Sequence, residues 1–232
     1  AGGGGVGPGG VGAGGGAVGG GGAARLLGAG AAGAGGWGVG GWIIGILARA
    51  GVGTLILADG DTFGENNLNR QLYAAEENLG EPKAEAAARR VRAVNSAVEV
   101  KALNFFLDEE NCEAALDGAD VVLDALDSNG ARSVVFRACA KLGVPFVHGA
   151  IGGLYGETAV LRAGDVPPWE LFGAGDKGEE VERGNPSFTP PFIASAQAAE
   201  AVRILTRGEE TQRKTLFWFD ISRLTVRRLN LK

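Results

Sequence analysis

The residues best suited to chemistry in this chain follow one short apolar run. Residues 54–58 have the apolar, β-branched composition of a buried parallel strand, and Asp59 and Asp61 come directly after them. Open α/β sheets bind their ligands at the carboxyl ends of the strands. We therefore expect both aspartates to lie at a ligand-binding edge.

The segment after Asp61 offers hydrogen-bond donors and little that could pack in a core. Amide and guanidinium groups donate to anionic oxygens, and this segment holds Asn66, Asn67, Asn69, Arg70 and Gln71. Lys83 follows at the start of a predicted helix, just after Pro82. Alone, Lys83 would be interpreted as an exposed surface lysine. Together these residues predict a polyphosphate-binding site.

A glycine-rich turn precedes the strand and leads into an apolar helix. Glycines let the backbone approach a phosphate, and a helix N-terminus supplies free N–H groups. One register places Gly35, Gly38 and Gly40 under a nucleotide, and Asp59 then follows Gly40 by 19 positions, close to the usual spacing. This register puts Trp37 where a glycine is expected. A shifted register that begins at Gly33 fits the glycine pattern and breaks the spacing.

A second apolar run, residues 121–125, also ends in acidic and polar groups, at Asp127 and Ser128. The repeated pattern predicts that Asp59 and Asp127 converge on one pocket from separate strands. His148 is the single histidine and ends another predicted strand. We expect it to be hydrogen-bonded to backbone, since no nucleophile lies nearby for a general base to activate.

The order of the predicted elements gives the fold class. Strands at 54–58, 98–106, 121–125, 145–149 and 157–161 alternate at first with helices at 84–95, 108–116 and 129–142; a helix from Pro190 and two strands within 214–231 close the chain. We predict an α/β fold: a doubly wound, mainly parallel nucleotide-binding sheet with an antiparallel C-terminal part. Residues 163–190 should form an irregular binding loop or lid.

Residues 1–34 form a Gly/Ala-rich segment, and residues 35–232 form the predicted domain. The stretch at 28–34 occupies the place of the strand that a βαβ unit needs before the glycine turn. The chain has no methionine, and we hypothesise that many glycines and alanines here stand for unassigned side chains.

Composition narrows the class of protein. The formal net charge of −5 and the pI near 5.1 argue against a nucleic-acid binder. Cys112 and Cys139 stand alone in predicted helices, without a CxxC pair, so we expect neither a disulfide framework nor a structural zinc. No apolar run is long enough to span a membrane, and we expect a cytoplasmic location.

From about residue 35 to residue 232 the chain resembles the MoeB/ThiF/HesA family, the bacterial relatives of ubiquitin-activating enzymes. The blocks that carry the resemblance are DGDTFGENNLNRQ at 59–71, GEPKAE at 80–85 and DALDS at 124–128, in the order and spacing of that family. The resemblance implies an ATP-dependent adenylyltransferase. Its expected partner is a ubiquitin-like sulfur-carrier protein ending in Gly-Gly, as in molybdopterin or thiamine synthesis, and its expected assembly is a homodimer.

The resemblance also implies roles for single residues. Asp59 would hold the ribose hydroxyls of ATP, with Asp61 beside it; Asp127 would hold Mg²⁺. The groups expected on the phosphates are Asn67, Arg70, Gln71 and Lys83, and we name Arg70, Lys83 and Asp127 as the catalytic set. Many relatives also supply an arginine from an N-terminal helix to the partner subunit, and only Arg25 is available for that here.

Three alternatives stay open. A related enzyme could adenylate a tRNA base or a peptide with the same site. An NAD-dependent oxidoreductase would share the nucleotide-binding turn, although Arg70, Lys83 and Asp127 would have no role in it. A catalytically silent module would bind nucleotide without exchanging pyrophosphate. The sequence does not name the carrier, the pathway or the fate of the adenylate.

Overall fold

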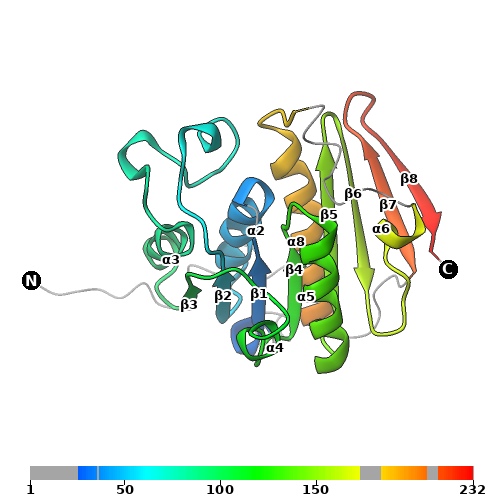
Figure 1. Ribbon diagram of the computed structural model, residues 1–232, viewed down its shortest axis with the longest axis horizontal. Helices are drawn as coiled ribbons and strands as arrows, with labels where there is room; N and C mark the ends of the chain where they lie inside the picture. The colour runs from blue at the N-terminus through cyan, green and yellow to red at the C-terminus, as the bar shows by residue number, and fades with distance from the viewer. Residues whose placement is uncertain (1–25, 36, 173–183, 208–213, 232) are drawn as a thin grey trace, which may run out of the picture.

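A computed structural model describes residues 26–35, 37–172, 184–207 and 214–231 (Figure 1). Residues 1–25 lie outside the described residues, and with them most of the segment to which the hypothesis of unassigned side chains applies. The same holds for Arg25 and for residues 173–183 of the predicted loop between residues 163 and 190.

Eight strands form one sheet in the order β3-β2-β1-β4-β5-β6-β7-β8. The strands are β1 (Gly30–Ala34), β2 (Thr54–Ala58), β3 (Glu99–Leu103), β4 (Val121–Asp124), β5 (Phe146–Gly152), β6 (Tyr155–Leu161), β7 (Thr215–Asp220) and β8 (Thr225–Asn230). The first five pair in parallel, and β6, β7 and β8 continue the sheet antiparallel from β5. This confirms the predicted mainly parallel sheet with an antiparallel C-terminal part.

The Gly/Ala-rich stretch forms β1, which lies between β2 and β4 near the centre of the parallel half. Its alanines Ala31, Ala32 and Ala34 are at most 1% exposed. The strand predicted from the need of a βαβ unit is therefore present, and the sheet includes residues N-terminal to Gly35.

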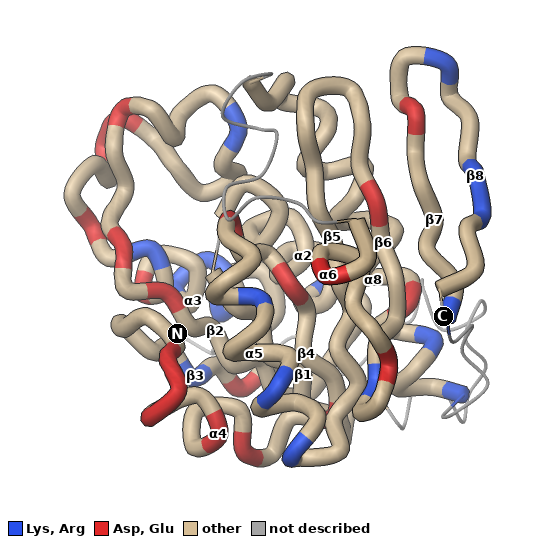
Figure 2. The backbone as a smooth tube through the Cα atoms, turned by 45° about the vertical axis from the view of Figure 1, so that its right-hand side comes forward, with Lys and Arg blue, Asp and Glu red and all other residues tan. Residues whose placement is uncertain are grey.

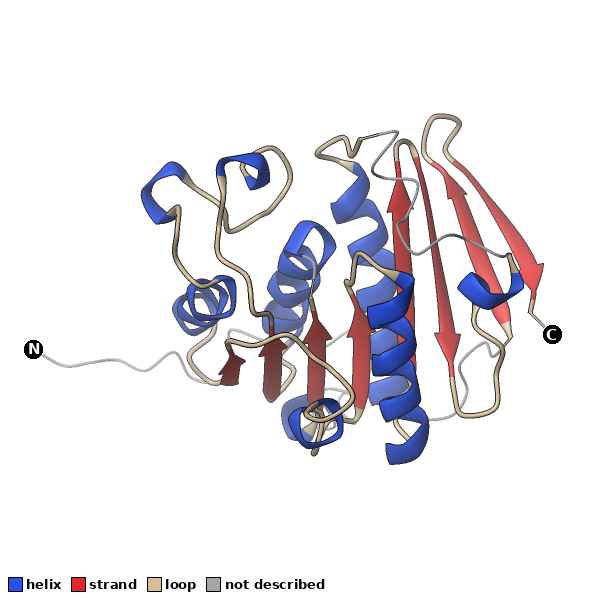
Figure 3. Ribbon diagram, viewed as in Figure 1, coloured by secondary structure: helices blue, strands red, loops and turns tan. Residues whose placement is uncertain are grey.

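Helices cover both faces of the sheet, which makes it doubly wound (Figure 3). One core cluster joins the sheet to α2 (Trp37–Ala50), α3 (Lys83–Val94) and α8 (Thr189–Arg207). The other joins the opposite face to α4 (Cys112–Ala115), α5 (Asn129–Leu142) and α6 (Pro168–Leu171). Figure 1 shows the two layers, with α5 in front of the strands and α8 behind them.

Sequence signals fix α5 closely. Ser128 caps its N-terminus by accepting a hydrogen bond from the backbone N–H of Ala131, and Gly143 ends it in the left-handed conformation. The helix has the predicted limits. By contrast β3 and α4 are shorter than predicted, and α6 is a short helix inside the segment predicted to be irregular.

Helix α2 is apolar on more than one face because it packs within the subunit. Ile43 and Ile44 are 1% and 3% exposed, and Trp42 and Ile46 pack against the same core cluster. The apolar composition of α2 is therefore accounted for by contacts within one chain. None of the described helices is long and apolar enough to cross a bilayer.

Candidate active site

An open pocket of about 610 Å³ lies at the carboxyl ends of the parallel strands. The chain leaves β1 toward β2 on one side and β4 lies on the other, so this is the point where the strand order reverses and where such sheets bind ligands. Of the predicted site residues, those that line the pocket are Gly35, Gly38, Asp59, Asp61, Asn67, Arg70, Gln71, Lys83 and Asp127. The predicted convergence of Asp59 and Asp127 is confirmed.

The glycine turn follows the shifted register. β1 ends at Ala34, Gly35 has a positive φ of 69°, and α2 begins at Trp37, so Gly35 lies in the turn between strand and helix. Gly40 lies inside α2 and does not line the pocket. A Cβ on Gly40 would meet the Gly35 carbonyl at 3.0 Å and the Ala125 side chain at 3.2 Å. In the structure Gly40 therefore lets the helix approach the strands.

Residues 61–83 form an excursion that carries most of the polar groups. It is closed at its base, where the Lys83 N–H donates to the Asp61 carbonyl at 3.0 Å and the Phe63 N–H donates to the Glu81 carbonyl at 3.0 Å. Figure 1 shows it rising above α2 and α3. The closed base explains how Lys83 reaches the pocket from 22 positions beyond Asp61.

One face of α2 receives this excursion. Gly38, Gly41 and Gly45 lie on that face, three and four positions apart, and added Cβ atoms there would meet the side chains of Arg70, Leu72 and Tyr73 respectively. The nearest distance at Gly38 is 3.8 Å, to Arg70 Nε. The glycines of α2 thus bring the guanidinium of Arg70 against the start of the helix.

Lys83 is buried, with 5% of its side chain exposed, and its ammonium is ion-paired with Asp61, whose side chain is 55% exposed. Burial alone would raise the pKa of Asp61. The hydrogen bonds from Lys83 and from the Thr62 backbone outweigh burial and lower the pKa. Lys83 is therefore not the exposed lysine that its spacing alone suggested.

Arg70 and Gln71 carry hydrogen-bond donors, and both residues line the pocket. The Arg70 guanidinium donates to the Asn66 carbonyl at 2.7 Å and to Asn69 Oδ1 at 2.9 Å, both within the excursion. Gln71 is 7% exposed, and its Oε1 has no hydrogen-bond partner among the described residues. This buried amide oxygen is an acceptor, so the partner that it lacks is a hydrogen-bond donor, such as a hydroxyl or amino group of a ligand in the pocket.

Asp59 directly follows β2 and is 5% exposed. Its Oδ1 accepts a hydrogen bond from the Asp61 N–H at 2.8 Å, and burial raises its pKa. A buried acid at this position can accept hydrogen bonds from ligand hydroxyls. The hydroxyls of a ribose are such donors.

Asp127 stands on the turn between β4 and α5, and sequence reasoning missed the side chains that hold this turn. Arg132 donates to the Leu126 carbonyl at 2.6 Å and to Asp124 Oδ2 at 3.1 Å. Asp124 is fully buried, and its Oδ1 accepts from the Leu126 N–H at 2.9 Å. An arginine on the first turns of the helix that follows the acidic strand end was the available signal.

The prediction for His148 was wrong. Both ring nitrogens of this buried side chain face carboxylates: Nδ1 lies 2.7 Å from Asp124 Oδ2, and Nε2 lies 3.2 Å from Glu157 Oε1. Burial opposes the charged ring, but the hydrogen bonds to the two carboxylates outweigh it and raise the pKa of His148. Period-2 patterning placed His148 in a strand and could not show which acids flank it.

The two cysteines lie in helices, as predicted, and both are buried, Cys112 in α4 and Cys139 in α5. Burial raises the pKa of Cys112 to about 11 and that of Cys139 further. Neither lines the pocket. Both thiols are therefore poorly suited to nucleophilic chemistry at this site.

The residues present fit a nucleoside triphosphate with Mg²⁺. The described residues contain no group of three or more acids, histidines or cysteines that could enclose a metal. Mg²⁺ in phosphate sites needs one or two protein carboxylates, because the substrate phosphates and water supply the other ligands. Asp127 lines the pocket and can supply one.

The chain is similar in sequence to several known enzymes. The SAMP-activating enzyme E1 of Haloferax volcanii is 33% identical over 178 residues, which cover 74% of this chain and 66% of that protein. The sulfur carrier protein ThiS adenylyltransferase of Escherichia coli is 34% identical over 185 residues, 75% of this chain and 70% of that protein. The chain thus spans about two thirds of the length of these relatives.

Solved structures agree on the fold. Escherichia coli MccB has a TM-score of 0.77 and 19% identity, with 90% of this chain and 64% of that chain covered. The model of the ThiF family matches residues 16–232. The chain belongs to the ThiF family.

Proposed function

We propose that this chain is an ATP-dependent adenylyltransferase that activates the C-terminal glycine of a ubiquitin-like sulfur-carrier protein. The single observation that carries the proposal is the pocket, in which cationic and amide donors from the excursion face acids from the ends of β2 and β4. The names of relatives at least 30% identical support the substrate class, since they include sulfur carrier protein adenylyltransferases and a SAMP-activating enzyme.

In this proposal the nucleotide lies across the glycine turn. Asp59 accepts hydrogen bonds from the ribose hydroxyls, and Gly35 and Gly38 leave room for the phosphates beside the N-terminus of α2. Arg70 and Lys83 supply positive charge along the triphosphate. The side-chain amides of Asn67 and Gln71 add neutral hydrogen-bond donors for the phosphates.

The reaction needs no nucleophile from the protein. A carboxylate oxygen of the carrier's last glycine attacks the α-phosphorus of ATP, the bond to the bridging oxygen breaks, and pyrophosphate leaves with the electron pair. Arg70 and Lys83 neutralise the charge that builds on the leaving group. Asp127 would hold Mg²⁺, which when bound shields the phosphate oxygens from one another. Lys83 must exchange Asp61 for a phosphate oxygen.

The other candidate functions lack a supporting observation. A hydride-transferring enzyme would not use Arg70, Lys83 and Asp127 around one pocket. A tRNA base or a peptide as the acceptor would use the same site, so the acceptor rests on the names of the relatives. A homodimer and a cytoplasmic location stay predictions; light scattering that shows a monomer at micromolar concentration would contradict the former.

Transfer of label from ATP tests the proposal. The chain is incubated with a carrier ending in Gly-Gly and labelled ATP, and the carrier is separated under acidic conditions. With [α-³²P]ATP we expect label on the carrier as its adenylate. With [γ-³²P]ATP we expect no label on the carrier. Exposed Glu109→Gln on the surface pair with Arg137 is the control and should leave labelling unchanged. Labelling by the γ-phosphate, or reduction of NAD with no adenylate formed, would contradict the proposal.

A further inference from the structure

The turn that carries Asp127 is held by one buried carboxylate. Asp124 Oδ1 accepts from the Leu126 N–H, and Asp124 Oδ2 receives both the Arg132 guanidinium at 3.1 Å and the His148 ring at 2.7 Å. Arg132 also donates to the Leu126 carbonyl at 2.6 Å. Both backbone groups of the residue before Asp127 are therefore fixed by this pair.

We propose that His148, in its imidazolium form, is a positioning residue for Asp127. It acts through Asp124 and Arg132, which fix the turn, while Glu157 fixes the far side of the ring. That Asp127 binds Mg²⁺ rests on the proposed function; that its turn is held through His148 does not.

Hydrogen-bond geometry requires the imidazolium. A neutral ring has one N–H donor and one acceptor nitrogen, whereas ionised carboxylates only accept. Both ring nitrogens of His148 lie within 3.2 Å of a carboxylate oxygen. Between two ionised carboxylates, a neutral ring would set one nitrogen lone pair against an oxygen lone pair, at a ring whose side chain is only 2% exposed.

Charge balance leads to the same form. Among the described residues, the charged groups that meet here are Asp124 from β4, Arg132 from α5 and Glu157 from β6. The elements α6 and α8 contribute neutral groups: the Trp169 ring, 5.1 Å from the His148 ring, and Gln197, which donates to the Asp124 and Val147 carbonyls. Two carboxylates then balance one guanidinium and one imidazolium.

Loss of the His148 proton leaves a buried net negative charge and removes one link to Asp124. Unpaired buried charge is costly, so Asp124 must shift or draw in water. Either change loosens the turn before Asp127. Glu157 lies on β6, the first antiparallel strand, so its contact with His148 also ties the antiparallel part of the sheet to this cluster.

Because His148 is the only histidine, its ring can be followed without assignment. The first measurement is the ¹⁵N spectrum of the imidazole in the full chain without a histidine tag. We expect both nitrogens to carry protons at pH 7 and to titrate at a pH above that of a free histidine. A singly protonated ring at pH 7 would overturn the proposal.

The second measurement links the ring to Asp127. In ATP–pyrophosphate exchange, kcat should fall on the alkaline side at the pH where the NMR signal reports loss of the His148 proton. Glu157→Gln should move both transitions to lower pH together. Glu113→Gln, which removes the same charge from the exposed pair with Lys141, should move neither. His148→Gln should lower kcat by about 10- to 100-fold at pH 7 and remove the alkaline transition.

Calorimetry separates this proposal from the proposed function. ATP affinity is measured with and without Mg²⁺. The increase in ATP affinity that Mg²⁺ produces should become smaller at the pH where His148 loses its proton. If wild type exchanges no pyrophosphate but shows this fall, the proposed reaction fails and the positioning role stands. If Glu157→Gln moves the His148 titration while both the exchange transition and the Mg²⁺ gain stay in place, the positioning role is wrong.

Discussion

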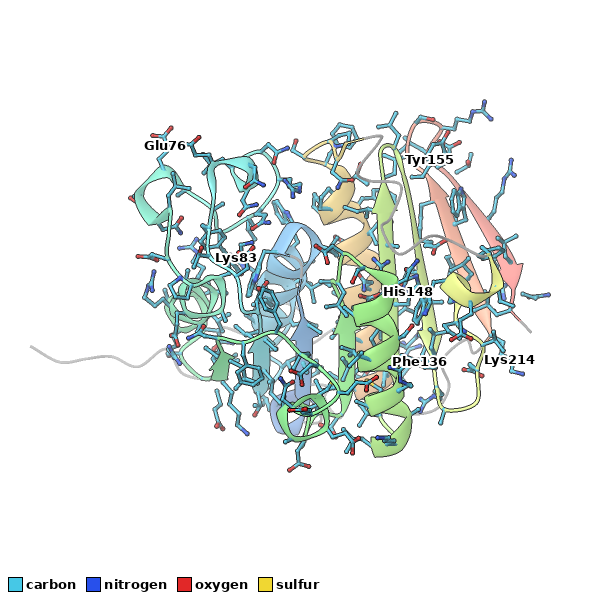
Figure 4. The ribbon with its side chains drawn as sticks, in the orientation of Figure 1. Glu76, Lys83, Phe136, His148, Tyr155 and Lys214 are labelled. Atoms are coloured by element: carbon cyan, nitrogen blue, oxygen red, sulfur yellow. The ribbon has the colours of Figure 1, made fainter. Side chains whose placement is uncertain are left out.

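Two ion-pair clusters flank the pocket, and they differ in burial. Lys83 pairs with Asp61, which is more than half exposed, whereas Arg132 and His148 pair with Asp124, which is fully buried. Figure 4 shows Lys83 beneath the excursion beside α3 and His148 behind α5. An exposed acid gives up its partner to a substrate at little cost, whereas a buried acid cannot. We infer that the first cluster binds and the second fixes geometry.

The distribution of charge along the chain does not separate the two clusters. Acidic and basic residues are interspersed along the described chain (Figure 2). The difference between the two clusters therefore depends on local burial. Variants that change one residue at a time test it.

The largest effect is expected for Asp124→Asn. It removes the carboxylate from a buried guanidinium and a buried imidazolium, and we expect the free energy of unfolding to fall by about 3–5 kcal/mol. Urea denaturation measures this. Asp61→Asn is the matched change at the ion pair of Lys83, and it should cost less because Asp61 is more than half exposed. Equal losses would remove the distinction between the clusters.

Arg70→Ala and Asp127→Ala should act on the reaction and leave stability nearly unchanged. Each removes a group that stabilises the transition state, and we expect a loss of about 2–4 kcal/mol, which is roughly 30- to 1000-fold, in pyrophosphate exchange. The hydrogen bonds of Arg70 stay within the excursion, so its loss should not unfold the chain. Exchange at the wild-type rate in Arg70→Ala would contradict its role.

Stability should decrease as the pH rises because of His148. Its pKa in the folded chain is raised above the ordinary value of 6.5, so the stabilisation is fully present below pH 6.5 and is lost as the pH rises through the folded pKa. Thermal unfolding from pH 6 to 9 checks this. In His148→Gln the decrease should be smaller, and an identical decrease would assign it to another group.

The smallest effect is expected for the cysteines. Cys112→Ala and Cys139→Ala should leave pyrophosphate exchange nearly intact, because both thiols are buried away from the pocket and their pKa values are raised. Labelling of the native chain with a thiol reagent should be slow. Loss of exchange in either variant with its fold intact would bring a thiol into the reaction.

The sequence predicted what depends on local pattern. Apolar runs located β2 and β4, and the acids after them located the pocket, because parallel strands end at one edge. The glycine register needed the structure: only the end of β1 at Ala34 shows that Gly35 makes the turn. Spacing to Asp59 favoured the other register because it assumes a shorter path from turn to acid.

Side-chain contacts between residues far apart in the chain could not be predicted from the sequence. His148 meets Asp124 from 24 positions away and Glu157 across an antiparallel pair, and neither distance has a signature in a single sequence. Lys83 lay in a correctly predicted helix, yet its burial follows from the closed base of the excursion. The motifs named residues that line the pocket, and the fold was needed to find the residues that hold them.

The central claim is that this pocket transfers AMP to a carrier's C-terminus. ATP–pyrophosphate exchange with a sulfur carrier ending in Gly-Gly, compared with the same carrier lacking its last glycine, tests it most directly. We predict rapid exchange with the intact carrier and background exchange with the shortened one. Equal exchange with both carriers, or none with either, would contradict the account.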